Sequence, residues 1–260
     1  GLLITPSGLR LPLYRSYYTK EYLKQRNQRR AKKKQPALPY RKQTELAAEL
    51  IHTAPVPKKA KVVVLGDTAF DAEVLQEACR KEGYSWIVSM NQERVLDGKK
   101  PRPKVWSLAT TFQAHQFAPV KLTPGKGRYV AQRRVAACRL GRKAKTRTFY
   151  VHRETLTVYS VGKVQVVFST MLEPKRGKPV EIQKVLMTND LKLSAAQIVE
   201  LYDLRWQIEL FFKELKSTLG FDQYRFQKFG KVERWVDLCL ITVLYLEWYR
   251  AEKLARRDLT

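Results

Sequence analysis

Short apolar runs and a helical pattern alternate along the first third of the chain. A continuously apolar run over residues 61–66 is typical of a strand buried on both faces, and residues 85–89 form a second run of this kind. Between them, residues 71–82 have helical spacing and end at Gly83, a residue type that commonly closes a helix. Strand, helix and strand in this order predict two parallel strands of an α/β sheet. A hairpin is expected before them, over residues 2–18.

The middle of the chain has the alternating pattern of strands, interrupted by Gly and Pro. The runs that fit a strand are residues 128–140, 146–151, 155–159 and 164–172. We therefore interpret residues 92–187 as a mostly-β subdomain inserted into the α/β pattern. The predicted organisation is a core whose first part covers residues 1–91 and whose helical C-terminal part covers residues 188–260.

Helical spacing returns in the last quarter of the chain. Ser194 is a suitable N-cap for a helix that continues to Gly220, and a final apolar helix is expected over residues 232–256. Spacings of i, i+4, i+7 and i+8 predict the buried stripe of the first helix, which consists of Leu204, Ile208, Phe211, Phe212, Leu215 and Leu219. This helix can pack one side into a core and present polar side chains at its edge.

The net charge of the chain indicates which kind of ligand the protein binds. The sequence has 50 Lys+Arg against 24 Asp+Glu, a formal net charge of +26. A chain this basic is expected to bind a polyanion, and nucleic acid is the commonest one. Residues 20–42 are especially basic and have little to bury, so we expect a loop that is mobile without a partner. Its role is either that of a solvated surface or that of a clamp on DNA phosphates.

The sequence lacks the patterns typical of a membrane-spanning protein, a disulfide-bonded protein or a zinc site. No apolar run approaches the roughly 20 residues that span a bilayer, so no membrane association is expected. Cys79, Cys138 and Cys239 are far apart and odd in number, and we interpret them as buried thiols in a reducing cytoplasm. The three histidines are isolated, so a zinc site is not expected.

Polar residues of the first C-terminal helix form a candidate site. At about 100° per residue, four of them fall within an arc of roughly 60°: Tyr202, Arg205, Glu209 and Lys216. A carboxylate can hold a hard cation while Arg and Lys hold anionic oxygens, so the set suits a metal ion and a phosphate; a solvated helix surface is the alternative. Asp67 directly follows the first buried strand, where open α/β sheets place ligand sites, although a helix N-cap would explain it equally well.

The spacing of these four residues resembles the Y-R-E-K signature of DDE-type transposases of bacterial insertion sequences. The flanks agree with the signature over residues 188–190 and 212–216, and residues 65–71 resemble the second acidic motif of the same family. The resemblance implies an α/β fold with an RNase H-like (retroviral-integrase-like) core and an inserted mostly-β subdomain. It also implies that Asp67 and Glu209 are the second and third catalytic acids and ligate the metal.

The resemblance carries expectations about cofactors and partners as well. Two Mg²⁺ ions, with Mn²⁺ as a possible substitute, would activate the attacking oxygen and stabilise the leaving one. Tyr202, Arg205 and Lys216 would hold DNA phosphates, and Trp206 would either stack on a displaced base or pack in the core, which is the interpretation we favour. The expected partners are double-stranded DNA, as transposon ends and target, and a second copy of the chain in a synaptic homodimer. The expected location is the bacterial cytoplasm, in association with the nucleoid.

The first of the three family acids has no match, because no aspartate occurs between Gly1 and Gly66. The chain begins with Gly1 rather than Met, and we expect the missing acid on an upstream strand. The expected activity is metal-dependent cleavage of transposon ends and strand transfer into target DNA, a cut-and-paste reaction. Two alternatives remain: a non-catalytic DNA-binding remnant or regulator, and a metal-dependent nuclease that cuts without joining.

Overall fold

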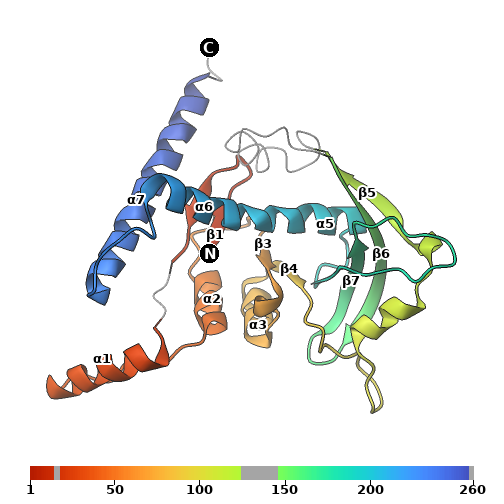
Figure 1. Cartoon of the computed structure of the whole chain (residues 1–260), viewed down its shortest axis with the longest axis horizontal. Coiled ribbons are helices and arrows are strands. Elements are labelled where there is room, and N and C mark those ends of the chain that lie inside the picture. The colour runs from red at the N-terminus through yellow and green to blue at the C-terminus, as the bar shows by residue number, and fades with distance from the viewer. Residues whose placement is uncertain (15–17, 124–145, 258–260) are drawn as a thin grey trace.

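A mixed six-stranded sheet organises the part of the chain that the structure describes. The computed structural model describes residues 1–14, 18–123 and 146–257, with a sheet in the order β3-β4-β8-β7-β6-β5 (Figure 1). The strands are β3 (Val63–Gly66), β4 (Ser85–Ser89), β8 (Lys184–Thr188), β7 (Gly162–Thr170), β6 (Arg147–Val158) and β5 (Ala118–Leu122). β3 and β4 are parallel, and the other neighbouring pairs are antiparallel. The chain therefore has the mixed α/β architecture that the sequence predicts.

The predicted strand–helix–strand unit is confirmed. α3 (Glu73–Glu82) connects β3 to β4, whose pairing begins with Val63 opposite Ser85. Gly83 ends the helix with a φ of 70°, a conformation that a residue without Cβ adopts at little steric cost. Because the two strands are parallel, their last residues, Gly66 and Ser89, lie at the same end of the sheet. We call this end the carboxyl edge.

The β-rich middle segment continues the same sheet. β8 pairs with β4, and β7, β6 and β5 follow it. The sheet thus crosses the boundaries placed at residues 91 and 187, and the division into domains stays a prediction. The runs predicted over 146–151 and 155–159 form one strand, β6, because its pairing with β7 continues unbroken between them. The strand predicted over 128–140 lies outside the described residues.

Two helices and a tight turn replace the single helix predicted from Ser194 to Gly220. α5 (Ala195–Asp203), the 3₁₀ turn η4 (Leu204–Trp206) and α6 (Gln207–Leu219) follow one another almost in line (Figure 1). The predicted ends are confirmed, since the Ser194 hydroxyl accepts a backbone N–H at 3.2 Å and Gly220 has a φ of 59°. A short 3₁₀ stretch within a helix often marks a functional position, and this one carries two residues of the candidate site.

The basic segment expected to be a loop is in large part a helix, α1 (Lys20–Lys32). The loop prediction is wrong because Lys, Gln, Arg and Glu are good helix formers even where few apolar residues are available to bury. The Thr19 hydroxyl caps the helix by accepting the Tyr22 backbone N–H at 3.2 Å, and Leu23 packs inward with 5% of its surface exposed. α1 lies at the periphery of the molecule, away from the six-stranded sheet (Figure 1).

The remaining elements flank the sheet. The predicted N-terminal hairpin is confirmed as β1 and β2, and the predicted last helix as α7. Their bounds, with those of the other short elements, are β1 (Leu2–Ile4), β2 (Arg10–Pro12), α2 (Gln43–His52), η1 (Thr68–Phe70), η2 (Val105–Thr111), η3 (Ala114–Gln116) and α7 (Phe229–Arg257). Within the described ranges, none of the helices combines the length and apolar character needed to cross a membrane.

Alternate residues of the central strands face two separate cores. Trp86 and Val88 of β4 pack with α2, α3 and η2, whereas Ile87 between them packs with α5. β7 and β8 show the same alternation, as the two-residue period of a strand requires. Tyr202 and Leu204 belong to the core under α5. Their burial fixes the junction of α5 and α6 against the sheet.

The cysteines agree with the interpretation as buried thiols where the structure describes them. Cys79 and Cys239 are free and buried, while Cys138 lies outside the described residues. Burial raises the pKa of Cys79 to about 12 and also raises that of Cys239. Both therefore stay protonated at neutral pH and lack the thiolate that reactive cysteines require.

Candidate active site

Asp67 lies directly after β3, at the carboxyl edge of the sheet. Its Oδ1 accepts the backbone N–H of Ala69 at 3.0 Å, so the carboxylate caps the 3₁₀ turn η1. The two interpretations that the sequence leaves open, a helix cap and a site carboxylate, are compatible because a carboxylate has a second oxygen. Gly66 allows close packing here, since a Cβ would lie 3.0 Å from the Phe70 Cβ and 3.2 Å from the Val88 Cγ1.

Three residues of the signature lie together where α5 meets α6. The Arg205 Nη2 donates to the Glu209 Oε1 at 2.7 Å, across one helical turn. The Arg205 guanidinium also lies 5.8 Å from the centre of the Tyr202 ring, and Tyr202 is buried. The side chain of Glu209 is the most open of the three, with 41% of its surface exposed. The structure thus brings these three residues together, as their spacing predicts.

The charges of Asp67 and Glu209 act on the same arginine. Burial acts to lower the pKa of Arg205, but the hydrogen bond with Glu209 and the neighbouring negative charges, including that of Asp67, raise it overall. Burial raises the pKa of Tyr202, and the positive charge of Arg205 opposes this shift. Asp67 and Glu209 come from distant parts of the chain, and the charges of both act on Arg205.

Lys184, the first residue of β8, is a site residue that the sequence analysis missed. β8 is antiparallel to β4, with Leu186 opposite Ser89, so the start of β8 lies at the carboxyl edge. There the Lys184 Nζ lies 5.2 Å from the centre of the Tyr202 ring. The only sequence signal is a lysine at the start of an apolar run, a pattern too common to single out a functional residue.

The Lys184 ammonium group shares its surroundings with the charges of the signature. The residue is exposed, yet the protein around the ammonium group desolvates it enough to lower its pKa, and the positive charge of Arg205 lowers it further. The carboxylates of Glu209 and Asp67 oppose this shift. Two cations therefore lie among two carboxylates, an arrangement in which Lys and Arg can hold the oxygens of a phosphate.

A pocket of about 470 Å³ opens beside these side chains, a size in the range of ligand pockets. Its lining includes Asp67, Ser89, Trp106, Lys184, Tyr202 and Arg205. Glu209 borders this lining through its ion pair with Arg205. The indole N–H of Trp106 is buried and finds no hydrogen-bond partner among the described residues.

Lys216 does not join the three signature residues at the pocket. It shares their face of the helix, but it lies seven residues beyond Glu209, which is about 10 Å further along the axis at 1.5 Å per residue. Its Nζ lies 3.8 Å from the Asp222 Oδ2. The angular spacing that groups Lys216 with the other three residues takes no account of this axial distance. The contact of Lys216 with DNA stays a prediction.

Trp206 is exposed over 53% of its surface, so the favoured interpretation that it packs in the core is wrong. Its neighbours Leu204 and Gln207 take the inward positions at the η4 turn and are buried. Trp206 therefore faces solvent at the junction of α5 and α6. Whether it stacks on a base stays a prediction.

The carboxylate oxygens of Asp67 and Glu209 are the ligand type that Mg²⁺ prefers. Each carboxylate has one oxygen engaged, by the Ala69 N–H and by Arg205 respectively. In the part of the chain that the structure describes, no three His, Cys, Asp or Glu side chains form a group that could hold a metal. A two-metal site would therefore need a further carboxylate to complete it.

Comparison with known proteins gives a match that covers most of the chain. A family described as the transposase DDE domain matches residues 39–245. The matched region contains both carboxylates, both cations and Tyr202. No curated protein matches the sequence. The extent of the family match establishes that this chain belongs to the transposase DDE domain family.

Proposed function

We propose that this chain is the catalytic core of a cut-and-paste transposase of the Y-R-E-K branch, with an RNase H-like fold. The observation that carries the proposal is that Asp67, at the end of β3, lines one pocket with Lys184 and Arg205, and that Arg205 pairs with Glu209 of α6 at 2.7 Å. The proposed reaction is metal-dependent cleavage at transposon ends followed by strand transfer into target DNA. The proposed partners are duplex DNA and a second copy of the chain, in the bacterial cytoplasm at the nucleoid.

Asp67 and Glu209 would hold Mg²⁺, and Mn²⁺ would substitute for it. When bound, two such ions supply activation of the attacking oxygen and stabilisation of the leaving oxygen in phosphoryl transfer. The carboxylate donors suit this role, and a third carboxylate is needed beside them. The proposal therefore requires an acid other than Asp67 and Glu209, as the family resemblance also implies.

The cations of the site would bind and orient the DNA phosphate. A guanidinium has five N–H donors, so Arg205 can hold Glu209 with one of them and offer others to phosphate oxygens. Lys184 would add a point charge beside the Tyr202 ring, and Tyr202, which lies against both cations, would fix their positions. Lys216 and Trp206, both exposed, would contact DNA further along α6 and at its start.

A cleavage and joining assay tests the proposal. DNA duplexes from the regions that flank the gene are incubated with the protein and Mg²⁺ or Mn²⁺, together with a supercoiled target plasmid. Cleavage at discrete ends and their insertion into the plasmid are the expected result. Cleavage without insertion would instead identify a nuclease, and binding without cleavage would identify a DNA-binding remnant.

We expect Arg205→Lys to slow end cleavage by about 10- to 100-fold, or about 1.4–2.8 kcal/mol. Lysine keeps the charge but loses the planar fork that can hold Glu209 and a phosphate together. The measurement is the single-turnover cleavage rate beside the DNA dissociation constant, which should change little. Arg80→Lys, at an exposed position on α3, is the control. A wild-type cleavage rate in Arg205→Lys would remove Arg205 from the site.

We expect Lys184→Gln to lower the same cleavage rate by about tenfold, because one of the two charges that would hold the phosphate is lost. Lys184→Arg should recover part of the rate, since it restores the charge at the start of β8. Lys163→Gln, an exposed lysine of β7, removes the same charge away from the pocket and should leave the rate unchanged. Equal rates for Lys184→Gln and Lys163→Gln would show that Lys184 has no role in positioning the DNA.

A further inference from the structure

One face of α1 packs against the rest of the molecule. Asn27 exchanges two hydrogen bonds with the backbone of Leu38, at 2.8 and 2.9 Å, and the Arg30 Nε donates to the Pro36 carbonyl at 2.7 Å. The Arg26 guanidinium lies 4.8 Å from the centre of the Tyr18 ring. At about 100° per residue, these side chains and the buried Leu23 share one side of the helix. They fix the orientation of the opposite face.

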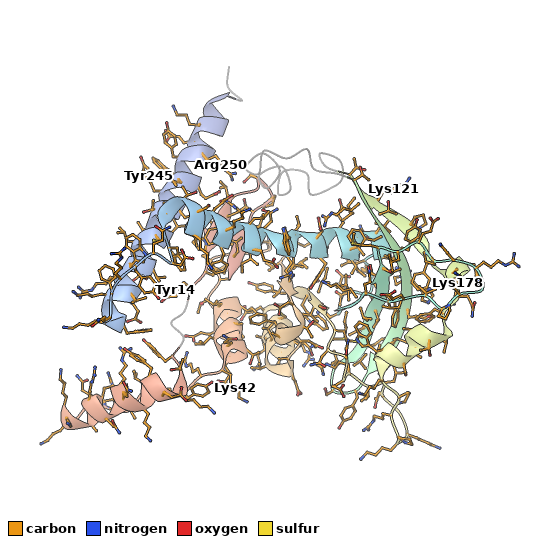
Figure 2. The ribbon with its side chains drawn as sticks, viewed as in Figure 1. Tyr14, Lys42, Lys121, Lys178, Tyr245 and Arg250 are labelled. Carbon is orange, nitrogen blue, oxygen red and sulfur yellow. The ribbon has the colours of Figure 1, made fainter. Side chains whose placement is uncertain are left out.

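The opposite face of α1 and the turn after it are basic and solvent-exposed. The exposed cations are Lys20, Lys24, Arg29, Lys32, Lys33 and Lys34, and the only exposed acid of residues 20–34 is Glu21. Lys20 lies at the border with the packed side, where its Nζ is 5.3 Å from the centre of the Tyr40 ring. Within the described ranges, none of these six cations takes part in an ion pair. Figure 2 shows long side chains extending from α1 into solvent. We call these six residues the α1 basic face.

The start of α7 brings further positive charge beside α1. Phe229 packs on the Tyr22 and Tyr18 rings, with centroid distances of 4.4 and 5.4 Å. The Tyr18 hydroxyl donates to the Glu233 Oε1 at 3.1 Å, so aromatic and polar contacts both join the two segments. Exposed Lys228, directly before α7, and exposed Lys231 and Arg234 of α7 flank this contact. Two basic segments from opposite ends of the chain are thus held together by aromatic packing and by the hydrogen bond from Tyr18 to Glu233.

We propose that the α1 basic face binds the phosphate backbone of duplex DNA, as a surface separate from the catalytic pocket. The proposal rests on the proposed function for its choice of DNA as the polyanion. Such a face carries no base-reading geometry, because its exposed side chains are mostly lysines that act as point charges. It therefore adds affinity that is independent of sequence and falls with salt, and it holds flanking or target DNA while the pocket holds the cut end.

The test compares two variants of the full chain with the same net charge. Lys24→Gln/Arg29→Gln/Lys32→Gln removes three charges from the α1 basic face and keeps residues that favour a helix. The control, Lys81→Gln/Lys163→Gln/Lys178→Gln, removes three exposed charges elsewhere; Lys178 lies on the other side of the molecule from α1 (Figure 2). Binding of a fluorescent DNA duplex of arbitrary sequence is measured in EDTA from about 50 to about 200 mM salt. A single-stranded RNA of equal length is measured in parallel.

The slope of log K against log salt should fall by about 0.9 for each lost phosphate contact, or about 2–3 in the α1 variant, and should be nearly unchanged in the control. Single Lys24→Gln and Lys32→Gln variants should each lower the slope by about one, which keeps the test decisive if circular dichroism shows the triple variant to be misfolded. Equal slopes in the α1 variant and the control, or a loss confined to RNA, would overturn the proposal. Because binding in EDTA involves no cleavage, this result is independent of whether the catalytic assignment holds.

Discussion

The Glu209→Gln variant is expected to bind DNA at least as tightly as the wild-type protein and to lose about 10³-fold or more in end cleavage. Glutamine preserves the size of the side chain and keeps an oxygen that can accept the hydrogen bond from the Arg205 Nη2, which lies 2.7 Å from the Glu209 Oε1. What it loses is the negative charge that a Mg²⁺ ligand supplies. Metal stabilisation of the transition state contributes several kcal/mol, and about 4 kcal/mol corresponds to about 10³ in rate.

Asp67→Asn should have the same effect through the other carboxylate. Asparagine caps helices as well as aspartate does, so the bond from the Ala69 N–H, 3.0 Å long in the structure, is retained and η1 stays folded. Single-turnover cleavage rates and DNA dissociation constants are measured at one salt concentration. A second measurement, the increase in melting temperature on adding Mn²⁺, is expected to be lost in both variants.

Glu73→Gln is the matched control for both substitutions. Glu73 is an exposed carboxylate in the first turn of α3, outside the pocket, and its variant should cleave at the wild-type rate. Wild-type cleavage by Glu209→Gln or by Asp67→Asn would exclude that carboxylate from the chemistry. If cleavage and DNA binding fell together, the carboxylate would instead have a structural role.

Local patterns in the sequence were sufficient for the elements that build most of the site. The strand before Asp67 and the closure of α3 by Gly83 depend only on neighbouring residues, and both were predicted. The predicted burial of this strand on both faces is wrong, because β3 is an edge strand and only Gly66 of its four residues is buried. The same holds for the meeting of Tyr202, Arg205 and Glu209, whose separation is set by helical geometry over two turns. Over this short distance the 3₁₀ turn η4 changes the helix too little to separate them.

The features that the sequence did not predict depend on which strands pair with each other and on which side chains are exposed. Lys184 reaches the carboxyl edge because β8 is antiparallel to β4, and no local pattern fixes which strand becomes the neighbour of which. Lys216 was placed by angle alone, whereas the length of α6 decides its distance from Glu209. Trp206 was expected in the core, but the η4 turn directs Leu204 and Gln207 inward and leaves Trp206 exposed. α1 was expected to be a loop because of its low apolar content, but helix propensity, the Thr19 cap and contacts with distant Phe229 decide its structure.

The second large effect is expected at Glu247, whose replacement by alanine should lower the free energy of unfolding by about 3–5 kcal/mol. Arg10 and Glu247 are almost fully buried, with 1% and 2% of their surfaces exposed. The Arg10 Nη2 and Nε donate to the Glu247 Oε1 at 3.1 and 3.3 Å, and the Arg250 Nη2 donates to the Oε2 at 2.8 Å. Removing the carboxylate leaves a buried guanidinium without its main counter-charge, which costs about that much.

The network around Glu247 joins three elements, so its loss affects more than one contact. Arg10 belongs to β2 and Glu247 to α7, and the Arg10 Nη2 also donates to Glu214 of α6 at 2.7 Å. α6 also carries Glu209, so the network helps to hold the helix of the candidate site. The midpoint of urea unfolding should fall by about 1 M or more, for an m value near 3 kcal/mol/M. Glu77→Ala, which breaks the exposed pair with Arg80, should cost less than about 1 kcal/mol.

The double variant Arg10→Met/Glu247→Leu separates the cost of an unpaired charge from the cost of lost packing. Both buried charges are removed together, and replacing a buried ion pair by apolar side chains of similar size is often neutral or stabilising. The double variant should therefore be more stable than Glu247→Ala, although Glu214 and Arg250 keep its recovery incomplete. The single variants Arg10→Met and Glu247→Leu complete the comparison. If the double variant loses as much unfolding free energy as these two lose in sum, Arg10 and Glu247 contribute independently. The stability of the hairpin on α7 would then come from packing around them, and not from their pairing.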